Sequence, residues 1–352
     1  MKKRLLAVVL VVAMTMTTLL ACSSKDDTKE TASTKETETK SEDTEELPEV
    51  TKVILNEVAH SIFYAPMYVA IEEGYFEEEG IDLELLTGFG ADKTMTAVLS
   101  GSADIGFMGS EASIYTYNEG ANDYVVNFAQ LTQRAGNFLV AREEMPDFTW
   151  DDLKGKDVLG GRKGGMPEMV FEYILRQNGI DPSTDVNIDQ SIDFGSTAAA
   201  FAENQADFTV EFEPGATNLE KEGKGYVVAS LGTDSGYVPY TAFSAKKSYI
   251  DKNPEVIQGF TNALQKGMDY VQTHTPEEIA AIIAPQFKET DTETITTIVT
   301  RYYDQDTWKE NLVFEEESFD LLQDILEDAG ELTERAPYED LVTTEFADKA
   351  AR

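Results

Sequence analysis

Short apolar runs alternate with helical patterns over most of the chain after residue 50, and this alternation constrains the fold more than any other feature. Residues 53–55 are an apolar run and residues 82–85 alternate acidic residues with leucine, and helical patterns over 66–73 and 93–100 follow them. Strands that alternate with helices favour parallel sheets covered by helices on both faces. The roughly 300 residues involved exceed what one core usually holds, so we expect an α/β protein with two lobes.

An internal repeat supports two lobes. Residues 97–107 and 200–210 share one form, in which a helix end, a tight turn and the dipeptide Ala-Asp precede a strand. Two copies so far apart do not form a solenoid, so we expect one copy in each lobe. Chance similarity between two strand-helix units is the alternative.

Two extended stretches, 137–142 and 239–244, are predicted to cross between the lobes at the hinge. We therefore expect residues 51–140 and 239–352 to form the first lobe with the C-terminal helices, and residues 141–238 to form the second. Capping-box spacing predicts helix starts at Thr149 and Thr275. The run 254–273 carries one apolar face and is predicted to be a packed helix.

The N-terminus has the pattern of a secretory signal. Three basic residues precede an apolar run over 5–21, and the end of this run together with Cys22 reads Leu-Ala-Cys, similar to a bacterial lipobox. We expect a signal peptide over 1–21, lipidation of Cys22 and anchoring at the extracellular face of the cell membrane. Cys22 is the only cysteine, which excludes disulfides within the chain. Residues 22–50 are almost entirely polar and acidic, so we expect a disordered tether.

The formal net charge is −38. A surface this acidic repels nucleic acid and anionic lipid, so we expect neither as a partner.

Ligands of α/β proteins bind beyond the carboxyl ends of parallel strands. Four such junctions are predicted, at 56–64, 88–94, 108–111 and 160–168, although each of them could be only a turn. The candidate ligand-binding residues at these junctions are His60, Phe63, Tyr64, Gly109, Ser110, Glu111, Gly164, Gly165 and Met166.

Two carboxylates, Glu211 and Glu213, follow a strand of the second lobe. Strand alternation would direct both to the same side, with Phe212 opposite, and such a pair suits an amine or an amino-heterocycle. Tyr237 is a further candidate, because its ring could stack on a planar ligand.

Residues 63–85 resemble the opening of substrate-binding proteins from importers of nitrate, sulfonate, taurine and thiamine pyrimidine precursors. Their pattern is a helix, then Glu-x-Gly-Tyr-Phe, then Gly-Ile-Asp-Leu, and the resemblance continues through 99–106, 152–156 and the glycines at 164–165. It implies the two-lobed type II periplasmic-binding-protein fold, a small-molecule ligand and an ABC importer permease as partner. We expect a monomer without a cofactor or bound metal.

The glycine loop and the Glu-x-Glu-Pro sequence at 211–214 look most like the pyrimidine-precursor branch, so the first ligand hypothesis is that precursor or a related N-heterocycle. A nitrate, sulfonate or taurine type of anion is the alternative, which Arg134 and Arg162 keep open. A pyrimidine synthase of the same fold uses its own histidine and a cysteine-rich motif, which this chain lacks, so we expect no enzyme. A sensory binding domain is a further alternative.

Overall fold

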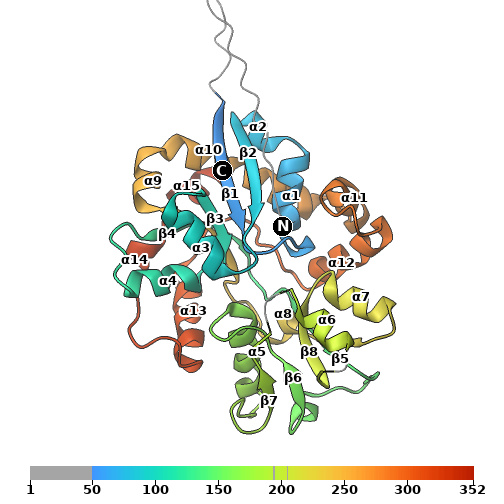
Figure 1. The fold of residues 1–352 in the computed structure, drawn as a ribbon. Helices are drawn as coiled ribbons and strands as arrows, with labels where there is room; N and C mark the ends of the chain where they lie inside the picture. The colour runs from blue at the N-terminus through green and yellow to red at the C-terminus, as the bar shows by residue number, and fades with distance from the viewer. Residues whose placement is uncertain (1–49, 193–194, 204) are drawn as a thin grey trace, which may run out of the picture. The chain divides into compact units, whose positions relative to one another are not determined.

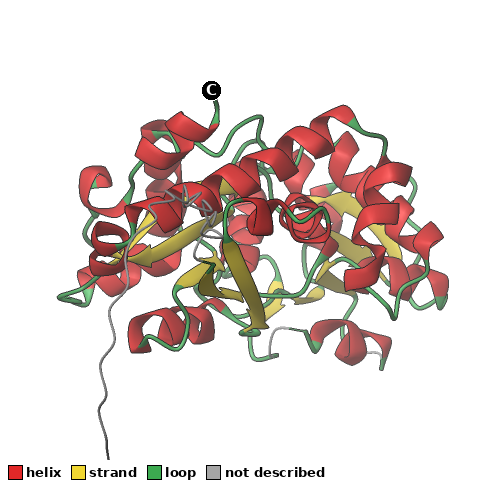
Figure 2. Ribbon diagram, turned by 90° about the horizontal axis from the view of Figure 1, so that it is seen from above, coloured by secondary structure: helices red, strands yellow, loops and turns green. Residues whose placement is uncertain are grey.

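The computed structural model describes residues 50–192, 195–203 and 205–352, which belong to one compact unit. The predicted signal peptide, Cys22 and all of the tether except residue 50 lie outside the described residues. Within the described residues, ten strands form two five-stranded sheets, and helices lie on both sides of the strands (Figures 1 and 2).

The first sheet has the order β2-β1-β3-β10-β4, in which β10 alone runs antiparallel to its neighbours. Its strands are β1 (Thr51–Glu57), β2 (Ile81–Thr87), β3 (Ile105–Met108), β4 (Val125–Thr132) and β10 (Thr241–Lys246). The helices connected to it are η1 (Ile62–Tyr64), α1 (Ala65–Glu72), α2 (Tyr75–Glu78), α3 (Ala91–Ser100), α4 (Glu111–Asn118) and α9 (Lys247–Lys252).

The second sheet repeats this topology, with the order β7-β6-β8-β5-β9 and β5 as the antiparallel strand. Its strands are β5 (Asn137–Ala141), β6 (Asp157–Leu159), β7 (Asn187–Asp189), β8 (Phe208–Phe212) and β9 (Tyr226–Ser230). The helices connected to it are η2 (Trp150–Leu153), α5 (Met166–Gln177), α6 (Thr197–Ala202), α7 (Gly215–Lys221) and α8 (Leu231–Asp234).

The internal repeat has a structural cause. Asp104 precedes β3, and its carboxylate and backbone amide bond to the backbone of Ile54 in the neighbouring strand, at 2.9 Å in each case. Asp207 precedes β8 and makes the same pair of bonds to Asp157, at 3.1 and 2.9 Å. Each aspartate thus fixes the start of the third strand of its sheet, which confirms that one copy lies in each lobe.

The C-terminal region is helical, and it packs on both lobes. It comprises α10 (Pro254–Thr273), α11 (Pro276–Ile283), η3 (Ala284–Gln286), α12 (Thr292–Asp304), α13 (Glu316–Asp328), α14 (Tyr338–Leu341) and α15 (Glu345–Ala350). Helix α10 packs on α1, whereas α13 packs on α5 of the second lobe (Figure 1). The predicted helix 254–273 and both predicted capping boxes are confirmed.

The crossings between the lobes lie earlier in the chain than the sequence predicts. Both extended stretches are paired on two sides inside a sheet, β5 in the second and β10 in the first. The chain instead crosses through the loops 133–136 and 235–240, which bond to each other through the Val238 amide and the Gln133 carbonyl at 2.9 Å. A buried extended stretch needs partners for its backbone, and a central sheet position supplies them.

Candidate ligand-binding site

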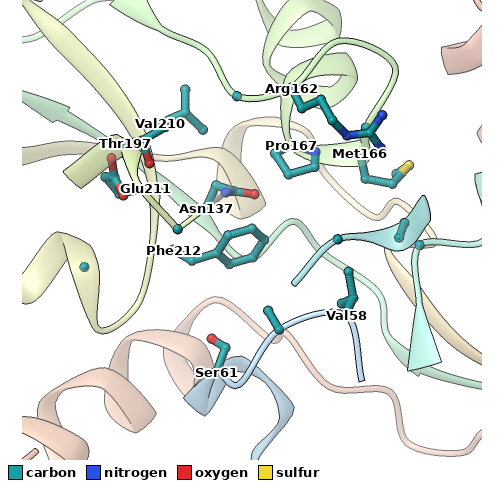
Figure 3. Close-up of a pocket in the computed structure, with 18 of the residues that line it drawn as sticks. Val58, Ser61, Asn137, Arg162, Met166, Pro167, Thr197, Val210, Glu211 and Phe212 are labelled. Carbon is teal, nitrogen blue, oxygen red and sulfur yellow. The ribbon is translucent and has the colours of Figure 1, made fainter. Parts of the chain in front are cut away.

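A cavity of about 300 Å³ lies between the two lobes, at the ends of their strands (Figure 3). From the first lobe its wall includes Val58, Ala59, His60, Ser61, Tyr64, Phe89, Gly90, Ala91, Gly109, Glu111, Tyr240 and Thr241. From the second lobe it includes Asn137, Gly161, Arg162, Gly165, Met166, Pro167, Gly195, Thr197, Ala198, Val210, Glu211, Phe212, Glu213, Pro214 and Gly215.

The topology explains why these segments meet. The parallel strands β1, β2 and β3 end at the cavity, as do β6, β7 and β8 from the other side, and the antiparallel strands β5 and β10 begin there. All four junctions that the sequence predicts therefore border one cavity, which is the position where α/β folds bind ligands.

Glu111, at the start of α4, is the carboxyl group that the first lobe contributes. Its side chain is buried, and its Oε2 atom accepts no hydrogen bond within the described part of the chain. Burial raises its pKa to about 7, although the backbone amide of Met166 and the charge of Arg162 act in the opposite direction. Glu111 thus faces the first residue of α5, across the cavity from its own lobe.

Glu211, at the end of β8, is the carboxyl group from the second lobe. Its Oε1 atom accepts a hydrogen bond from the Thr209 hydroxyl at 2.6 Å, and its side chain lies beside Thr197 (Figure 3). Burial raises the pKa of Glu211 to about 7, because the hydroxyls of Thr209 and Thr197 compensate only part of the cost of desolvating a charge.

Glu213 differs from the expectation, because its carboxylate is directed to a helix of the C-terminal region. It accepts hydrogen bonds from the Arg301 guanidinium at 2.7 Å and from the amide and hydroxyl of Thr217, both at 2.9 Å. The ring of Phe212 points into the cavity instead (Figure 3). The prediction that Glu211 and Glu213 share a side with Phe212 opposite is therefore wrong, since β8 ends at Phe212 and alternation ends with it.

The two adjacent aromatic candidates have different positions. Tyr64 lines the cavity, and its ring meets Phe107 edge-on at a centroid distance of 4.5 Å. Phe63 does not line it, because its ring is fully buried among Phe212, Tyr240 and other aromatic rings. Phe63 supports the wall from behind.

His60 lines the cavity but is fixed by its neighbours. Its Nδ1 atom lies 2.9 Å from the buried carboxylate of Glu57, and its Nε2 atom lies 3.0 Å from the carbonyl oxygen of Gln286. The Tyr68 hydroxyl already donates to Glu57 at 2.6 Å. Both ring nitrogens thus face acceptors, which favours the imidazolium and agrees with the raised pKa of His60, chiefly due to Glu57.

The remaining candidates divide between the wall and its surroundings. Gly109, Gly165 and Met166 line the cavity. Ser110 and Gly164 are buried next to it, and the Gly164 carbonyl accepts a hydrogen bond from the Tyr115 hydroxyl at 3.1 Å.

Tyr237 lies outside the cavity wall. Its hydroxyl donates to Asp306 at 2.5 Å, and its ring lies 4.1 Å below the guanidinium of Arg134. The group joins both crossing loops on the outside of the hinge, so Tyr237 and Arg134 have structural partners there.

The sequence profile of a family described as NMT1/THI5 like matches residues 62–279, which is more than half of the chain. The chain belongs to this family. A Bacillus subtilis relative, YtlA, which carries the provisional name of a binding protein, is 48% identical over 300 residues, covering 85% of this chain and 90% of YtlA.

Two more distant similarities are to a binding protein and to an enzyme. The alkanesulfonate-binding protein SsuA from Xanthomonas axonopodis, bound to MOPS, has a TM-score of 0.68 at 15% identity, covering 83% of this chain and 98% of SsuA. The 4-amino-5-hydroxymethyl-2-methylpyrimidine phosphate synthase of Aspergillus parasiticus is 25% identical over 222 residues, covering 59% of this chain and 63% of the enzyme. The likeness to SsuA shows that this family member has the two-lobed periplasmic-binding-protein fold.

Several wall residues of this family member were not among the sequence candidates. Asn137 and Thr241 are the first residues of the antiparallel strands β5 and β10. A polar residue at the start of each extended stretch is the sequence signal that identifies them. Thr197 follows β7, a strand of only three residues whose periodicity is too short to recognise. Tyr240 precedes β10 and is buried.

Within residues 50–192, 195–203 and 205–352, no group of three or more His, Cys, Asp and Glu side chains could hold a metal ion. No helix in this same part of the chain is long and apolar enough to cross a membrane.

Proposed function

We propose that this chain is the lipid-anchored substrate-binding component of an ABC importer, and that its ligand is a small N-heterocycle related to the thiamine pyrimidine precursor. The observation that carries this proposal is the pair of buried carboxyl groups, Glu111 from one lobe and Glu211 from the other, at one cavity.

A ligand rich in N–H donors suits these groups. Buried acceptors without a donor cost free energy, and a ring amine or amino group would satisfy the open Oε2 atom of Glu111. The rings of Tyr64, Tyr240 and Phe212 supply planar apolar surface. A cavity of about 300 Å³ lies at the lower end of the range for small-molecule sites, which suits a single substituted ring.

An anion of the nitrate, sulfonate or taurine type is the second candidate. Arg162 and the N-terminus of α5 line the cavity, and both favour negative charge. Glu111 faces the same helix end, however, and the carboxylate that forms as pH rises through its pKa of about 7 would repel an anion placed there. This repulsion makes the heterocycle the first choice.

Hinge closure is the mechanism we infer. The ligand contacts both lobes only when they are closed, so its higher affinity for that state shifts the population toward closure. The closed lobes would then present one joined surface to the permease. Lipidation at Cys22 would hold the protein at the extracellular face of the membrane, where the solute arrives.

A thermal-shift screen tests the ligand class. Aminopyrimidines, thiamine, riboflavin, nitrate, taurine and alkanesulfonates are each added to the wild type and to Glu211→Gln and Tyr64→Phe variants. A ligand that binds only the folded state raises Tm. We expect an aminopyrimidine to raise the wild-type Tm and Glu211→Gln to reduce the shift. Tyr64→Phe tests the hydroxyl without opening a cavity in the core.

Two outcomes would redirect the proposal. A shift with an anion, but not with an aminopyrimidine, would contradict the heterocycle. Mass spectrometry of the recovered ligand separates binding from catalysis, because a binding protein returns its ligand unchanged. Formation of a pyrimidine together with loss of a histidine from the protein would instead favour the synthase class.

A further inference from the structure

Phe89 is an exposed aromatic residue on the wall of the cavity. It lies between β2 and α3, and 59% of its surface is exposed to solvent. No ring contact joins Phe89 to another aromatic residue within residues 50–192, 195–203 and 205–352. Its ring therefore adds little to the stability of the ligand-free protein. Stability alone does not explain why an aromatic side chain occupies this position.

The backbone holds Phe89 in an unfavourable conformation. Its φ angle is +57°, in the left-handed region that side chains with a β-carbon rarely adopt. Asp306 is the other non-glycine residue in the described part of the chain with a positive φ. A strained residue persists where its surroundings fix it, and such residues cluster at ligand-binding sites.

Two glycines hold the strained residue in place. A β-carbon at Gly88 would lie 2.4 Å from the Thr94 hydroxyl oxygen and 2.6 Å from Asn56 Oδ1, so the chain passes too close to β1 and α3 for a side chain. Gly90 has a φ angle of +142°, which only glycine adopts readily. Phe89 is thus the single side chain that this three-residue turn presents.

Hydrogen bonds fix the turn to the end of β1. The amide of Gly88 donates to the carbonyl of Glu57 at 2.8 Å, and the amide of Gly90 donates to the carbonyl of Val58 at 3.0 Å. Lys93 Nζ donates to the carbonyl of Phe89 at 3.2 Å. The backbone of the turn is therefore firmly held beside the first ligand junction, while the ring remains exposed.

We propose that Phe89 is the specificity residue whose ring covers one face of a planar ligand when the lobes close. The inference rests on the proposed ligand-binding function, and it adds that the ligand has a flat apolar face. Closure would move the ring from water to the ligand, so its burial stabilises the liganded state alone. Because the backbone of the turn is fixed beforehand, binding costs only the rotational freedom of this one side chain.

Calorimetric titration of the purified protein tests the proposal. The probe is 4-amino-5-hydroxymethyl-2-methylpyrimidine, or whichever compound of the screen raises the wild-type Tm. We expect Phe89→Ala to weaken binding by about ten- to hundredfold, which corresponds to burying one aromatic side chain. Phe89→Trp should retain binding. The control is Leu99→Ala, an exposed apolar residue of α3 outside the cavity wall, with an expected change of less than about twofold.

The ligand-free protein supplies a second readout. Phe89→Gly removes the β-carbon from a left-handed position, so we expect Tm to rise by about 1–3 °C. A fall in Tm would show that the ring packs on its own protein, and it would overturn the proposal.

Comparison with Glu211→Gln separates this inference from the proposed function. If Phe89→Ala loses affinity while Glu211→Gln keeps the affinity of the wild type, the contact between the Phe89 ring and the ligand is supported. The same result would contradict recognition of the ligand by the Glu211 carboxyl group. Wild-type affinity in Phe89→Ala would overturn the ring contact. If Phe89→Ala keeps the affinity of the wild type but cells carrying it lose ligand uptake, the proposed ring contact is overturned as well. Phe89 would then contact the permease instead of the ligand.

Discussion

At the scale of single residues, burial of carboxyl groups is the property that most distinguishes the cavity. Glu211 is almost completely buried, with one Thr209 hydroxyl bonded to it and no cation beside it among the residues that affect its pKa. Such a group holds its proton to a higher pH in the folded protein than in the unfolded chain. The site is therefore sensitive to pH in a direction that can be measured.

The stability of the ligand-free protein should fall as pH rises from about 4.5 to about 7. Burial raises the pKa of Glu211 from 4.5 to about 7, so the folded state holds an extra proton between these values. Stability is therefore highest below pH 4.5 with respect to this group and is lost as pH rises through 7. Urea denaturation at about pH 5 and pH 8 measures the free energy of unfolding. We expect it to decrease between these pH values, and the decrease should be smaller in Glu211→Gln than in the wild type by roughly 1–3 kcal/mol.

The matched control is Glu255→Gln, which changes an exposed carboxyl group on α10. It should keep the wild-type dependence on pH. The same dependence in all three proteins would contradict the assignment of the effect to Glu211.

The sequence predicts the cavity junctions but not the direction of every side chain. Strand alternation applies only while the strand lasts, and β8 ends one residue before Glu213. Phe63 and Tyr64 are neighbours in a short helix, so one faces the cavity and the other the core. The position of a candidate near a strand end is predictable, whereas its side-chain direction depends on contacts from distant elements.

At the scale of secondary-structure elements, helix α12 joins the C-terminal region to the second lobe. Arg301 bonds to Glu213 at 2.7 Å and to Glu220 of α7 at 2.6 Å. Lys221 bonds to Asp291, which caps α12, at 2.9 Å. The carboxylate of Glu213 is fully buried, so Arg301 is needed to balance its charge.

Replacement of Arg301 by Met should destabilise the protein by about 2–4 kcal/mol, because it leaves a buried carboxylate without its cation. The double variant Arg301→Met with Glu213→Gln should recover a large part of this loss, since the unpaired charge is then absent. Urea denaturation of both variants measures the difference. Equal losses in the single and double variants would show that packing of the Arg301 stem, rather than charge, is the cause.

Much of the order of elements is predictable, because it depends on local signals. Both capping boxes and the helix 254–273 are set by residues close in sequence. The sequence predicts the two crossings too late in the chain, because an extended stretch has the same pattern whether it spans two lobes or lies between two partner strands in a sheet. The pairing of β5 and β10 depends on residues more than 60 positions apart, such as Phe138 and Glu211.

At the scale of the whole molecule, charge repulsion opposes folding. The chain has 66 acidic and 28 basic residues, so most surface acids have no basic partner available. Surface ion pairs add little individually. Repulsion between like charges is therefore the larger electrostatic effect at the surface, and it destabilises the compact state.

Salt should consequently stabilise the protein. Screening shortens the range of charge interactions from about 30 Å at 0.01 M to about 10 Å at 0.1 M ionic strength, so Tm should rise over this interval. Differential scanning calorimetry in sodium chloride and in potassium chloride measures the change in Tm. Equal changes in both salts would identify screening, rather than binding of one particular cation, as the cause. A fall in Tm would show that attractive ion pairs outweigh repulsion.

The position of Arg301 late in the chain has a consequence for biogenesis. A polypeptide emerges with its N-terminus first, so Glu213 and the strand before it are synthesised well before the guanidinium that neutralises them. The second lobe can assemble its sheet early, but the wall that carries Glu213 reaches its final pairing only after α12 has emerged. A chain truncated before α12 would thus contain every strand of both sheets and still lack the cation that neutralises Glu213.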